Sequence, residues 1–387
     1  MQIRIFRSAA EIEELRQAWT EKQRHPNSDI DHFLTVCATL DGVICPWVMS
    51  IASQEQIIGL VVARLERRPV RPRIGYGVLP GISAKSLSVI QGGFIGEFTD
   101  ATAAVGINGL LNQMQCGEFD YMTIHRLPAK CESIWNAVRE AARGKIDVAR
   151  LRWTPHRRLG LVGQKIGFLL DQMSSKHRYN TRRQDKKFIE AFPDQTEWQW
   201  HTHLQDVDGL CQRMEEVASK TYQRGLGAGF VNDEIHRRRL SEFARRDLLR
   251  VMLLTVNGQP KAYWLGTVYN GVFYSTSLGY TPDVADFGVG NLMLFKLVDR
   301  LVADGFTALD FGSGDAEYKD RFSDQSMDEA DATLYSGSFR SRCIQDYVAA
   351  VGRLDKTARA IAARMGTLNR LKRKWRDRLA AKAVLKP

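Results

Sequence analysis

The chain lacks the features that mark membrane-spanning, secreted and metal-binding proteins. No apolar run approaches the roughly 20 residues of a membrane helix. The first seven residues lack the apolar core of a signal peptide. The six cysteines show no Cys-x-x-Cys pair and no zinc spacing, which indicates free thiols and a cytoplasmic protein. We expect no metal, because His201 and His203 have no third ligand at a suitable spacing.

Several nucleotide-binding patterns are also missing. The chain has no Gly-Lys-Ser/Thr sequence of a P-loop, and Met293 stands where a dinucleotide fingerprint needs its third glycine. The triplet Asp310-Phe311-Gly312 occurs in kinases, but here it has no His-Arg-Asp motif and no glycine-rich loop before a strand lysine. These absences exclude a P-loop enzyme, a dinucleotide-binding protein and a kinase.

The composition is that of a globular protein with an unusual tail. The 387 residues are 44% hydrophobic and 26% charged, which suits two domains with substantial cores. The net charge of +11 is concentrated at the C-terminus, where residues 352–387 contain 12 Lys and Arg against Asp355 and Asp377. The remainder of the chain is therefore nearly neutral.

The most informative stretch is a glycine turn between a predicted strand and a predicted helix. The turn consists of Gly288, Val289, Gly290 and Asn291. A strand is expected at residues 271–280, and the apolar pattern of residues 292–301 predicts the helix. Glycines at a helix start let the backbone approach a ligand, and free N–H groups with the positive helix end favour phosphate. The turn predicts a site for a phosphorylated cofactor, although a tight turn without a ligand gives the same pattern.

The two halves of the chain follow one plan of helices, hairpin strands, a helix and a crossover strand. Asn257-Gly258 and Asn270-Gly271 are strong hairpin turns. In the second half we predict a helix at 207–222 and strands at 250–256, 261–268, 272–280, 307–311 and 330–336. In the first half we predict helices at 10–23 and 102–115 and strands at 47–52, 57–65, 74–78 and 121–125. The predicted domains are residues 1–165 and 166–345, followed by a tail at 346–387.

Matching Phe119 with Phe306 places Ala101 and Ala103 opposite Gly288 and Gly290. The first half therefore reads as a degenerate copy that kept the architecture and lost the glycines.

These features resemble the GCN5-related N-acetyltransferase (GNAT) superfamily, in which hairpins precede a crossover over a glycine turn. Residues 174–183 resemble the basic helix that opens the second domain of FemAB-like acyltransferases. The pattern Asp310-Phe311-Gly312-x-Gly314-Asp315-x-x-Tyr318-Lys319-x-x-Phe322 resembles a signature of their CelD-like branch, which is associated with polysaccharide biosynthesis. One departure is Ala285, where the GNAT pyrophosphate loop usually has Gln or Arg.

The resemblance implies a fold class and a cofactor. The fold class is α/β (α+β), with tandem GNAT-like domains, each a mixed, mostly antiparallel sheet flanked by helices, plus a basic C-terminal helix. Acetyl-CoA or another acyl-CoA is the implied co-substrate, held by the Gly288–Asn291 turn.

The same resemblance suggests roles for individual side chains. Asp315 would be the catalytic base and Tyr318 the acid that protonates the leaving thiolate. Arg178, Arg182 and Lys319 would contact the substrate. From the residues alone, Asp315 equally fits a helix cap, and the basic helix equally fits a solvated linker between domains.

The tail combines an apolar stripe with a basic face. The stripe recurs every three or four residues, at Leu354, Ala358, Ile361, Met365, Leu368, Leu371, Trp375, Leu379 and Ala383. The pattern predicts an interfacial helix on anionic lipid at the inner membrane face. Packing against the protein body or another subunit, and contact with RNA, are the alternatives.

The leading interpretation is a cytoplasmic acyl-CoA-dependent N-acyltransferase. Its acceptor would be an amino group of an envelope or exopolysaccharide precursor, either a small molecule or a lipid-linked glycan. One alternative is an aminoacyl-tRNA-dependent Fem-type ligase, although no long helical hairpin interrupts the second domain. The other is a non-enzymatic protein that binds membrane or nucleic acid through its tail.

Overall fold

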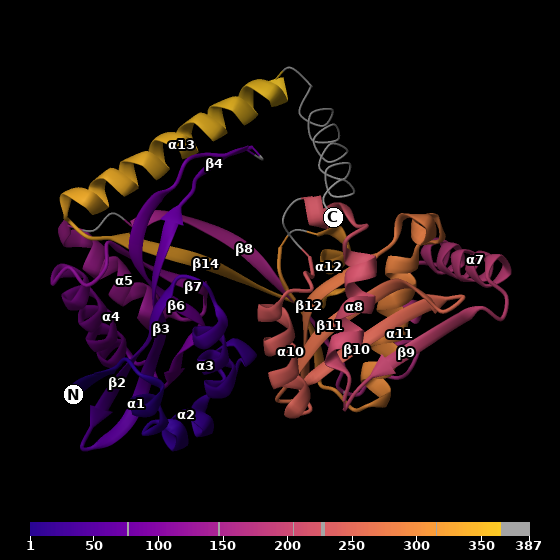
Figure 1. Ribbon diagram of the computed structural model, residues 1–387, viewed down its shortest axis with the longest axis horizontal. Helices are drawn as coiled ribbons and strands as arrows, with labels where there is room; N and C mark the ends of the chain where they lie inside the picture. Colours follow the sequence, from indigo (N-terminus) through magenta and orange to yellow (C-terminus); the bar gives the residue numbers. More distant parts are fainter. Residues whose placement is uncertain (76, 146–147, 204, 226–228, 315, 365–387) are drawn as a thin grey trace. The chain divides into compact units, whose positions relative to one another are not determined.

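The computed structural model describes residues 1–364 apart from 76, 146–147, 204, 226–228 and 315 (Figure 1). The chain forms two compact units. Within the described residues, unit 1 consists of Met1–Pro155 and the stretch that starts at Met327, and unit 2 consists of His156–Ser326.

Unit 1 is a six-stranded sheet in the order β1-β2-β3-β6-β7-β14. Among the described strand pairs of unit 1, only β6–β7 is parallel. The strands are β1 Gln2–Phe6, β2 Val43–Ser53, β3 Gln56–Val70, β6 Ile82–Gly96, β7 Tyr121–Pro128 and β14 Gln325–Tyr335, with a separate hairpin of β4 Arg73–Ile74 and β5 Gly77–Val78. The helices are α1 Ala9–Glu13, α2 Arg16–Lys22, η1 Pro26–Ser28, α3 Ile30–Thr39, α4 Asp100–Gln115, α5 Glu132–Lys145 and α13 Phe339–Arg364.

Unit 2 repeats this plan in the order β9-β10-β11-β12-β13-β8. In the described ladder of unit 2, only β12–β13 is a parallel pair. The strands are β8 Val148–Gly160, β9 Thr196–His201, β10 Leu249–Val256, β11 Gln259–Tyr269, β12 Val272–Tyr280 and β13 Ala308–Ser313. The helices are α6 Phe168–Asp171, α7 Ser175–Ala191, α8 Val207–Ala218, α9 Tyr222–Gly225, α10 Glu234–Arg245, η2 Pro282–Phe287, α11 Val289–Ala303 and α12 Glu317–Phe322.

The shared plan confirms the predicted fold class of two mixed, mostly antiparallel sheets flanked by helices. Residues Glu329–Tyr335 of β14 pair with β7 in unit 1, and residues 156–160 of β8 pair with β13 in unit 2. Unit 1 therefore combines two separate stretches of sequence, whereas the described part of unit 2 is the single stretch His156–Ser326. The division into 1–165, 166–345 and 346–387 stays a prediction.

The hairpin strands of the second half are confirmed as β10, β11 and β12. Two expectations for the first half are wrong. The strand that follows β3 in that sheet is β6, whereas Ile74, Gly77 and Val78 belong to the separate β4–β5 hairpin. The helix expected at 10–23 is two helices, because Glu14 and Leu15 form a turn between α1 and α2.

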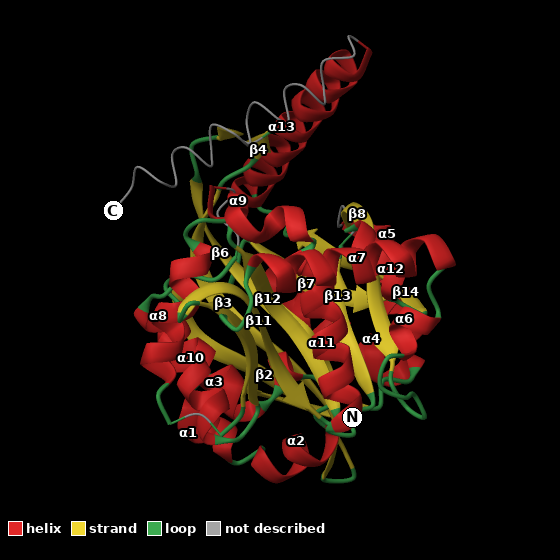
Figure 2. Ribbon diagram, turned by 90° about the vertical axis from the view of Figure 1, so that its right-hand side faces the viewer, coloured by secondary structure: helices red, strands yellow, loops and turns green. Residues whose placement is uncertain are grey.

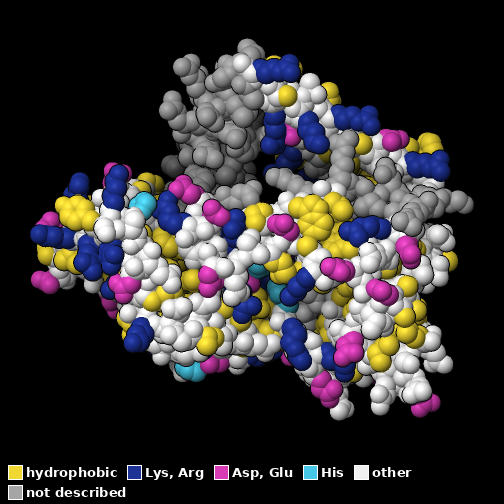
Figure 3. All heavy atoms as spheres, turned by 180° about the vertical axis from the view of Figure 1, so that it is seen from behind, with side chains coloured by type: hydrophobic (Ala, Val, Ile, Leu, Met, Phe, Trp, Pro, Cys, Tyr) yellow, Lys and Arg dark blue, Asp and Glu magenta, His cyan; other side chains and the backbone are white. Residues whose placement is uncertain are grey.

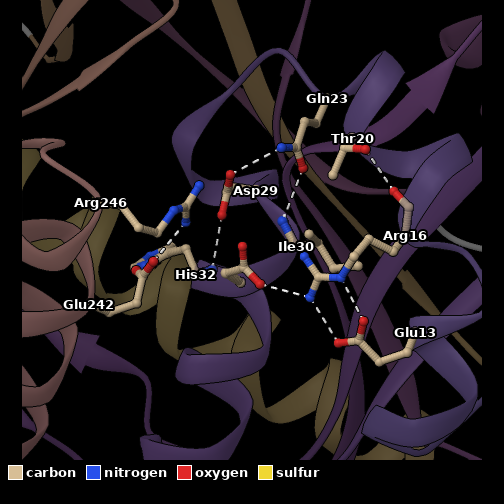
Figure 4. A network of polar contacts seen from close by, with 10 residues as sticks. Glu13, Arg16, Thr20, Gln23, Asp29, Ile30, His32, Glu242 and Arg246 are labelled. Carbon is tan, nitrogen blue, oxygen red and sulfur yellow. Dashed lines mark hydrogen bonds and ion pairs between the residues drawn. The ribbon is translucent and has the colours of Figure 1, made fainter.

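Each sheet is covered on both faces. In unit 1, α4 and α5 pack on one face, while α1, α2 and α3 pack around Val48, Leu60 and Val62 on the other. The buried Asp29 carboxylate caps α3 by accepting the His32 N–H at 3.1 Å, and Gln23 ties the same segment to α2 (Figure 4). In unit 2, α11 covers one face and α8 and α10 the other (Figure 2).

The helix α13 belongs to unit 1, and its first half is a packed element. Ile344 and Val351 are 1% and 4% exposed, and the Tyr347 hydroxyl donates to the carbonyl oxygen of Pro80 at 2.8 Å. Further along, Leu354 and Ile361 are 58% and 53% exposed. The predicted stripe from Met365 onward lies outside the described residues. Nowhere in the described part of the chain is a helix both long and apolar enough to cross a membrane.

Candidate acyl-transfer site

The parallel strands β12 and β13 separate before they end. Their register runs only from Val272 opposite Ala308 to Tyr274 opposite Asp310, yet β12 continues to Tyr280 and β13 to Ser313. A bulge sets the course of β12, because its pairing with β11 skips Thr276. Beyond Tyr274, the edge of β12 that faces β13 keeps its peptide groups free of a neighbouring strand in the described ladder.

The glycine turn forms the start of α11. Gly288 is its N-cap with φ of +69°, in the left-handed region that suits glycine, and no side chain caps the helix. Among the described residues, the N–H groups of Val289 and Gly290 have no acceptor, whereas those of Asn291 and Leu292 bond to the Gly288 carbonyl. Two backbone donors and the positive helix end are therefore available to an anion.

A pocket of about 810 Å³ opens where the strands diverge. Its volume is in the range of small-molecule and cofactor sites. Strand β12, the first turn of α11, the segment after α8 and the start of α12 supply most of its wall. The lining residues are Lys220, Thr221, Gln223, Gly229, Trp264, Ser275, Thr276, Ser277, Leu278, Gly279, Tyr280, Pro282, Ala285, Gly290, Asn291, Leu294, Phe311, Ala316, Tyr318 and Lys319.

Packed aromatic rings hold Tyr318 at this wall. Its ring meets Phe311 and Trp264 edge to face, with centroids 6.0 and 6.3 Å apart. The Trp264 indole N–H in turn donates to the Ser275 hydroxyl at 2.9 Å. Beside Tyr318, the Lys319 ammonium donates to the Ser313 carbonyl at 2.8 Å. A phenol and an ammonium group thus line one end of the pocket.

Four of the predicted site residues come together in this pocket: Gly290, Asn291, Tyr318 and Lys319. Val289 is fully buried in the core and can offer only its backbone. A Cβ on Gly288 would lie 2.6 Å from the Gln184 side chain, so this glycine makes room for α7. Asp315, the predicted base, lies outside the described residues.

The two predicted substrate-binding arginines stand apart from the pocket lining. Arg178 lies on α7, 3.8 Å from the Asp171 carboxylate, and Arg182 is exposed on the same helix. Lys and Arg side chains gather on this helix, at the left of Figure 3. The repulsion expected among them is partly offset within unit 2, because Lys186 also lies 3.7 Å from Glu190.

The sequence analysis missed a buried histidine–aspartate pair. Nε2 of His156 on β8 lies 2.8 Å from both carboxylate oxygens of Asp310 on β13, and the Gly312 N–H donates to Asp310 at 2.8 Å. Both side chains are about one-tenth exposed. His156 is also the register partner of Ser313, whose carbonyl holds Lys319.

The neighbour of this pair on β12 is Tyr274. Burial, and then the nearby Asp310 carboxylate, raises the pKa of Tyr274 to about 12, so its phenol stays protonated at neutral pH. Asp310 belongs to the motif recognised in the sequence, but nothing in the sequence links it to His156, 154 positions earlier.

Residues 175–320 match the family model described as "Acetyltransferase (GNAT) domain". This range contains every residue that lines the pocket. None of the curated proteins compared with the chain matches it. In the part of the chain that the structure describes, no cluster of three or more His, Cys, Asp or Glu side chains is suited to a metal ion.

Several solved structures share the fold. The crystal structure of FemX matches with a TM-score of 0.58 at 8% identity, covering 86% of this chain and 97% of its own. L-PGS from Bacillus licheniformis matches at 0.52 and 12% identity, over 90% and 98% of the two chains. The C-terminal domain of a putative lysylphosphatidylglycerol synthetase from Agrobacterium fabrum matches at 0.50 and 10% identity, over 91% and 97%. Residues 175–320 thus match the GNAT acetyltransferase model, and these solved structures share the fold of the chain.

Proposed function

We propose that unit 2 is an acyl-CoA-dependent N-acyltransferase. The observation that carries this proposal is the pocket between the diverging strands, bounded by the uncapped start of α11 at one place and by Tyr318 at another. The GNAT match over residues 175–320 supports the reaction class.

The pocket suits the chemistry of coenzyme A. The backbone N–H groups of Val289 and Gly290 would hold the pyrophosphate at the helix start. The free edge of β12 would pair with the amide groups of the extended pantetheine arm, as an added strand pairs with a sheet edge. Lys220 and Lys319 add positive charge to the lining. When bound, acyl-CoA supplies the activated thioester.

The transfer needs three proton movements. The acceptor ammonium first loses one proton, and its neutral nitrogen then bonds to the thioester carbon. The C–S bond breaks, the thiolate takes a proton from its acid, and the second proton of the attacking nitrogen restores that acid. Tyr318 would donate the proton to the thiolate. His156, oriented by Asp310, would accept the proton of the amine. Asp315 keeps its predicted role as the alternative base.

We infer an amino group of an envelope or exopolysaccharide precursor as the acceptor. The likeness of the segment from Asp310 to Phe322 to the CelD-like signature supports this class. The rival proposal is an aminoacyl-tRNA donor, because the chain shares its fold with FemX. Titration calorimetry with acetyl-CoA distinguishes an acyl-CoA donor from an aminoacyl-tRNA donor. Micromolar affinity with one site per chain supports the proposal, and no binding refutes it.

Variants test the roles of these side chains in acetyl transfer from acetyl-CoA to amino sugars. The rate is measured by the release of the CoA thiol. Tyr318→Phe should lower kcat by roughly 10²–10⁴ and leave acetyl-CoA affinity intact. The control Tyr347→Phe removes a phenol in unit 1 and should leave kcat unchanged. His156→Gln should lower kcat by roughly 10²–10⁴. An undiminished rate in His156→Gln together with a loss in Asp315→Asn would assign the base to Asp315.

The basic tail suggests where this enzyme works. We infer that the C-terminal region, starting with the exposed Leu354 and Ile361, attaches to anionic lipid, where lipid-linked acceptors are found. Each basic residue near such a surface contributes about 1 kcal/mol, and salt screens it. A chain ending at Val351 keeps the packed part of α13. The full chain should sediment with phosphatidylglycerol vesicles at low salt and the shortened one should not, and equal sedimentation would refute the attachment.

A further inference from the structure

Unit 1 contains a hydroxyl, an imidazole and a carboxylate in sequence across three neighbouring strands. The Ser88 hydroxyl on β6 lies 2.8 Å from Nε2 of His125 on β7. Nδ1 of the same ring lies 3.9 Å from the Asp331 carboxylate on β14. Each ring nitrogen of His125 therefore faces a different partner. The hydroxyl, imidazole and carboxylate stand in the same order as the nucleophile, base and orienting acid of a serine hydrolase triad.

The backbone around these residues is shaped to present them. The β7–β14 register shifts here, so that His125 and Arg126 stand opposite the single residue Asp331. Arg126 has φ of +48°, a left-handed conformation that is costly for a residue other than glycine. Its N–H donates to the Asp331 carboxylate at 2.7 Å. A bulge and a strained residue thus aim the imidazole and hold the acid.

The surroundings suit acyl chemistry. Ser88 is 7% exposed, while the His125 side chain is 39% exposed, so solvent reaches the pair from the imidazole side. The nearby His125 ring and the hydrogen bond from the Arg126 N–H lower the pKa of Asp331. Arg64 is the register partner of Ser88 on β3, and its guanidinium donates to the Glu66 carboxylate at 2.8 Å.

We propose that Ser88, His125 and Asp331 form a second catalytic site, which hydrolyses an acyl ester or thioester through an acyl-serine intermediate. The Ser88 oxygen bonds to the acyl carbon while its proton passes to Nε2 of His125. The bond to the leaving alcohol or thiol then breaks, and the leaving group takes that proton. Water attacks the acyl-serine, releases the carboxylic acid and restores the Ser88 hydroxyl. All three residues belong to unit 1, so this activity is separate from the transfer proposed for unit 2.

The test is covalent labelling of the full-length folded protein with a fluorophosphonate probe, followed by peptide mass spectrometry. We expect labelling at Ser88, because the activated hydroxyl displaces fluoride from phosphorus. Ser88→Ala and His125→Gln should each reduce labelling by at least about 100-fold, and Asp331→Asn by roughly 10- to 1,000-fold.

Ser86→Ala is the matched control, because Ser86 lies on the same strand and face and is also 7% exposed. It should label as the wild type does. Unchanged acetyl-CoA binding and melting temperature show that each variant is folded. A wild-type protein without label on Ser88, or equal labelling of His125→Gln, would overturn the proposal.

Discussion

The two units share one strand plan but differ at the start of the helix that follows the fourth strand, β6 in unit 1 and β12 in unit 2. In unit 1, α4 begins at Thr99, whose hydroxyl accepts the Thr102 N–H at 3.3 Å. In unit 2, α11 begins at Gly288 with no side-chain cap. One helix start is satisfied by its own side chain, whereas the other leaves its donors to a ligand.

A second difference lies after the crossover strand. In unit 1 this strand is followed by the 14-residue helix α5, which buries Trp135 to 1% exposure. In unit 2 the corresponding α12 has six residues, and its Tyr318 lines the pocket. The longer helix fills a core where the shorter one borders a cavity. The segment after the crossover strand therefore decides whether that place in the unit is a packed core or a cavity.

The largest effect is expected from removing a large buried side chain in unit 1. Trp135→Ala removes a buried indole and its hydrogen bond to the Pro128 carbonyl at 2.9 Å. We expect a loss of about 3–5 kcal/mol in the free energy of unfolding, measured by urea denaturation. Affinity for acetyl-CoA should persist under conditions where the variant is folded. A cost below about 1 kcal/mol would mean that α5 does not fill unit 1 as tightly as its burial indicates.

The next largest effect is a difference in acetyl-CoA affinity between variants at the two helix starts. Gly290→Val places a branched side chain at the pocket wall, because even a Cβ would lie 3.2 Å from the Tyr280 ring. Acetyl-CoA affinity should fall at least about 100-fold, or about 2.7 kcal/mol, by calorimetry. Ala101→Val is the control, since the exposed Ala101 has the same place in the first turn of α4. Equal affinities in both variants would remove the pocket from the proposed function.

The Ala101→Val control depends on how the starts of α4 and α11 are aligned. The sequence alone aligned them wrongly. Matching Phe119 with Phe306 placed Ala101 and Ala103 opposite Gly288 and Gly290. The helix starts instead place Thr99 opposite Gly288 and Ala101 opposite Gly290. The span from helix start to the matched phenylalanine is two residues longer in unit 1, so counting back from the phenylalanine loses register.

Local chemistry explains what the sequence predicted well. Asn257 and Asn270 adopt positive φ at their hairpin turns, and the strands on either side follow. Tyr318 and Lys319 come with the strand-turn-helix segment that the motif describes. The pairing of β14 with β7 and the contact of His156 with Asp310 join residues about 150 to 210 positions apart, and no local pattern encodes them. The partners of a sheet's outer strand are decided by tertiary packing.

A smaller effect tests the cap itself. Thr99→Ala removes the hydroxyl that accepts the Thr102 N–H, and should lower the free energy of unfolding by about 1 kcal/mol. Thr99→Ser keeps the hydroxyl and serves as the control. If Thr99→Ala costs nothing, water satisfies the start of α4, and the contrast between a capped and an open helix loses its energetic basis.

The smallest effect concerns the pH dependence of unit 1. The nearby His125 ring lowers the pKa of Asp331 from its ordinary value of 3.8. A carboxyl group with a depressed pKa contributes stability that is fully present above its unfolded pKa and is lost as the pH falls through its folded pKa. The stability gap between wild type and Asp331→Asn should therefore be constant from pH 5 to 7 and shrink below about pH 4, as urea denaturation at each pH can measure. Because the side chain is half exposed, solvent screening keeps this contribution small. A gap that widens in acid would mean that the carboxylate is not stabilised by His125, and the contact that orients the imidazole would have to be reassigned.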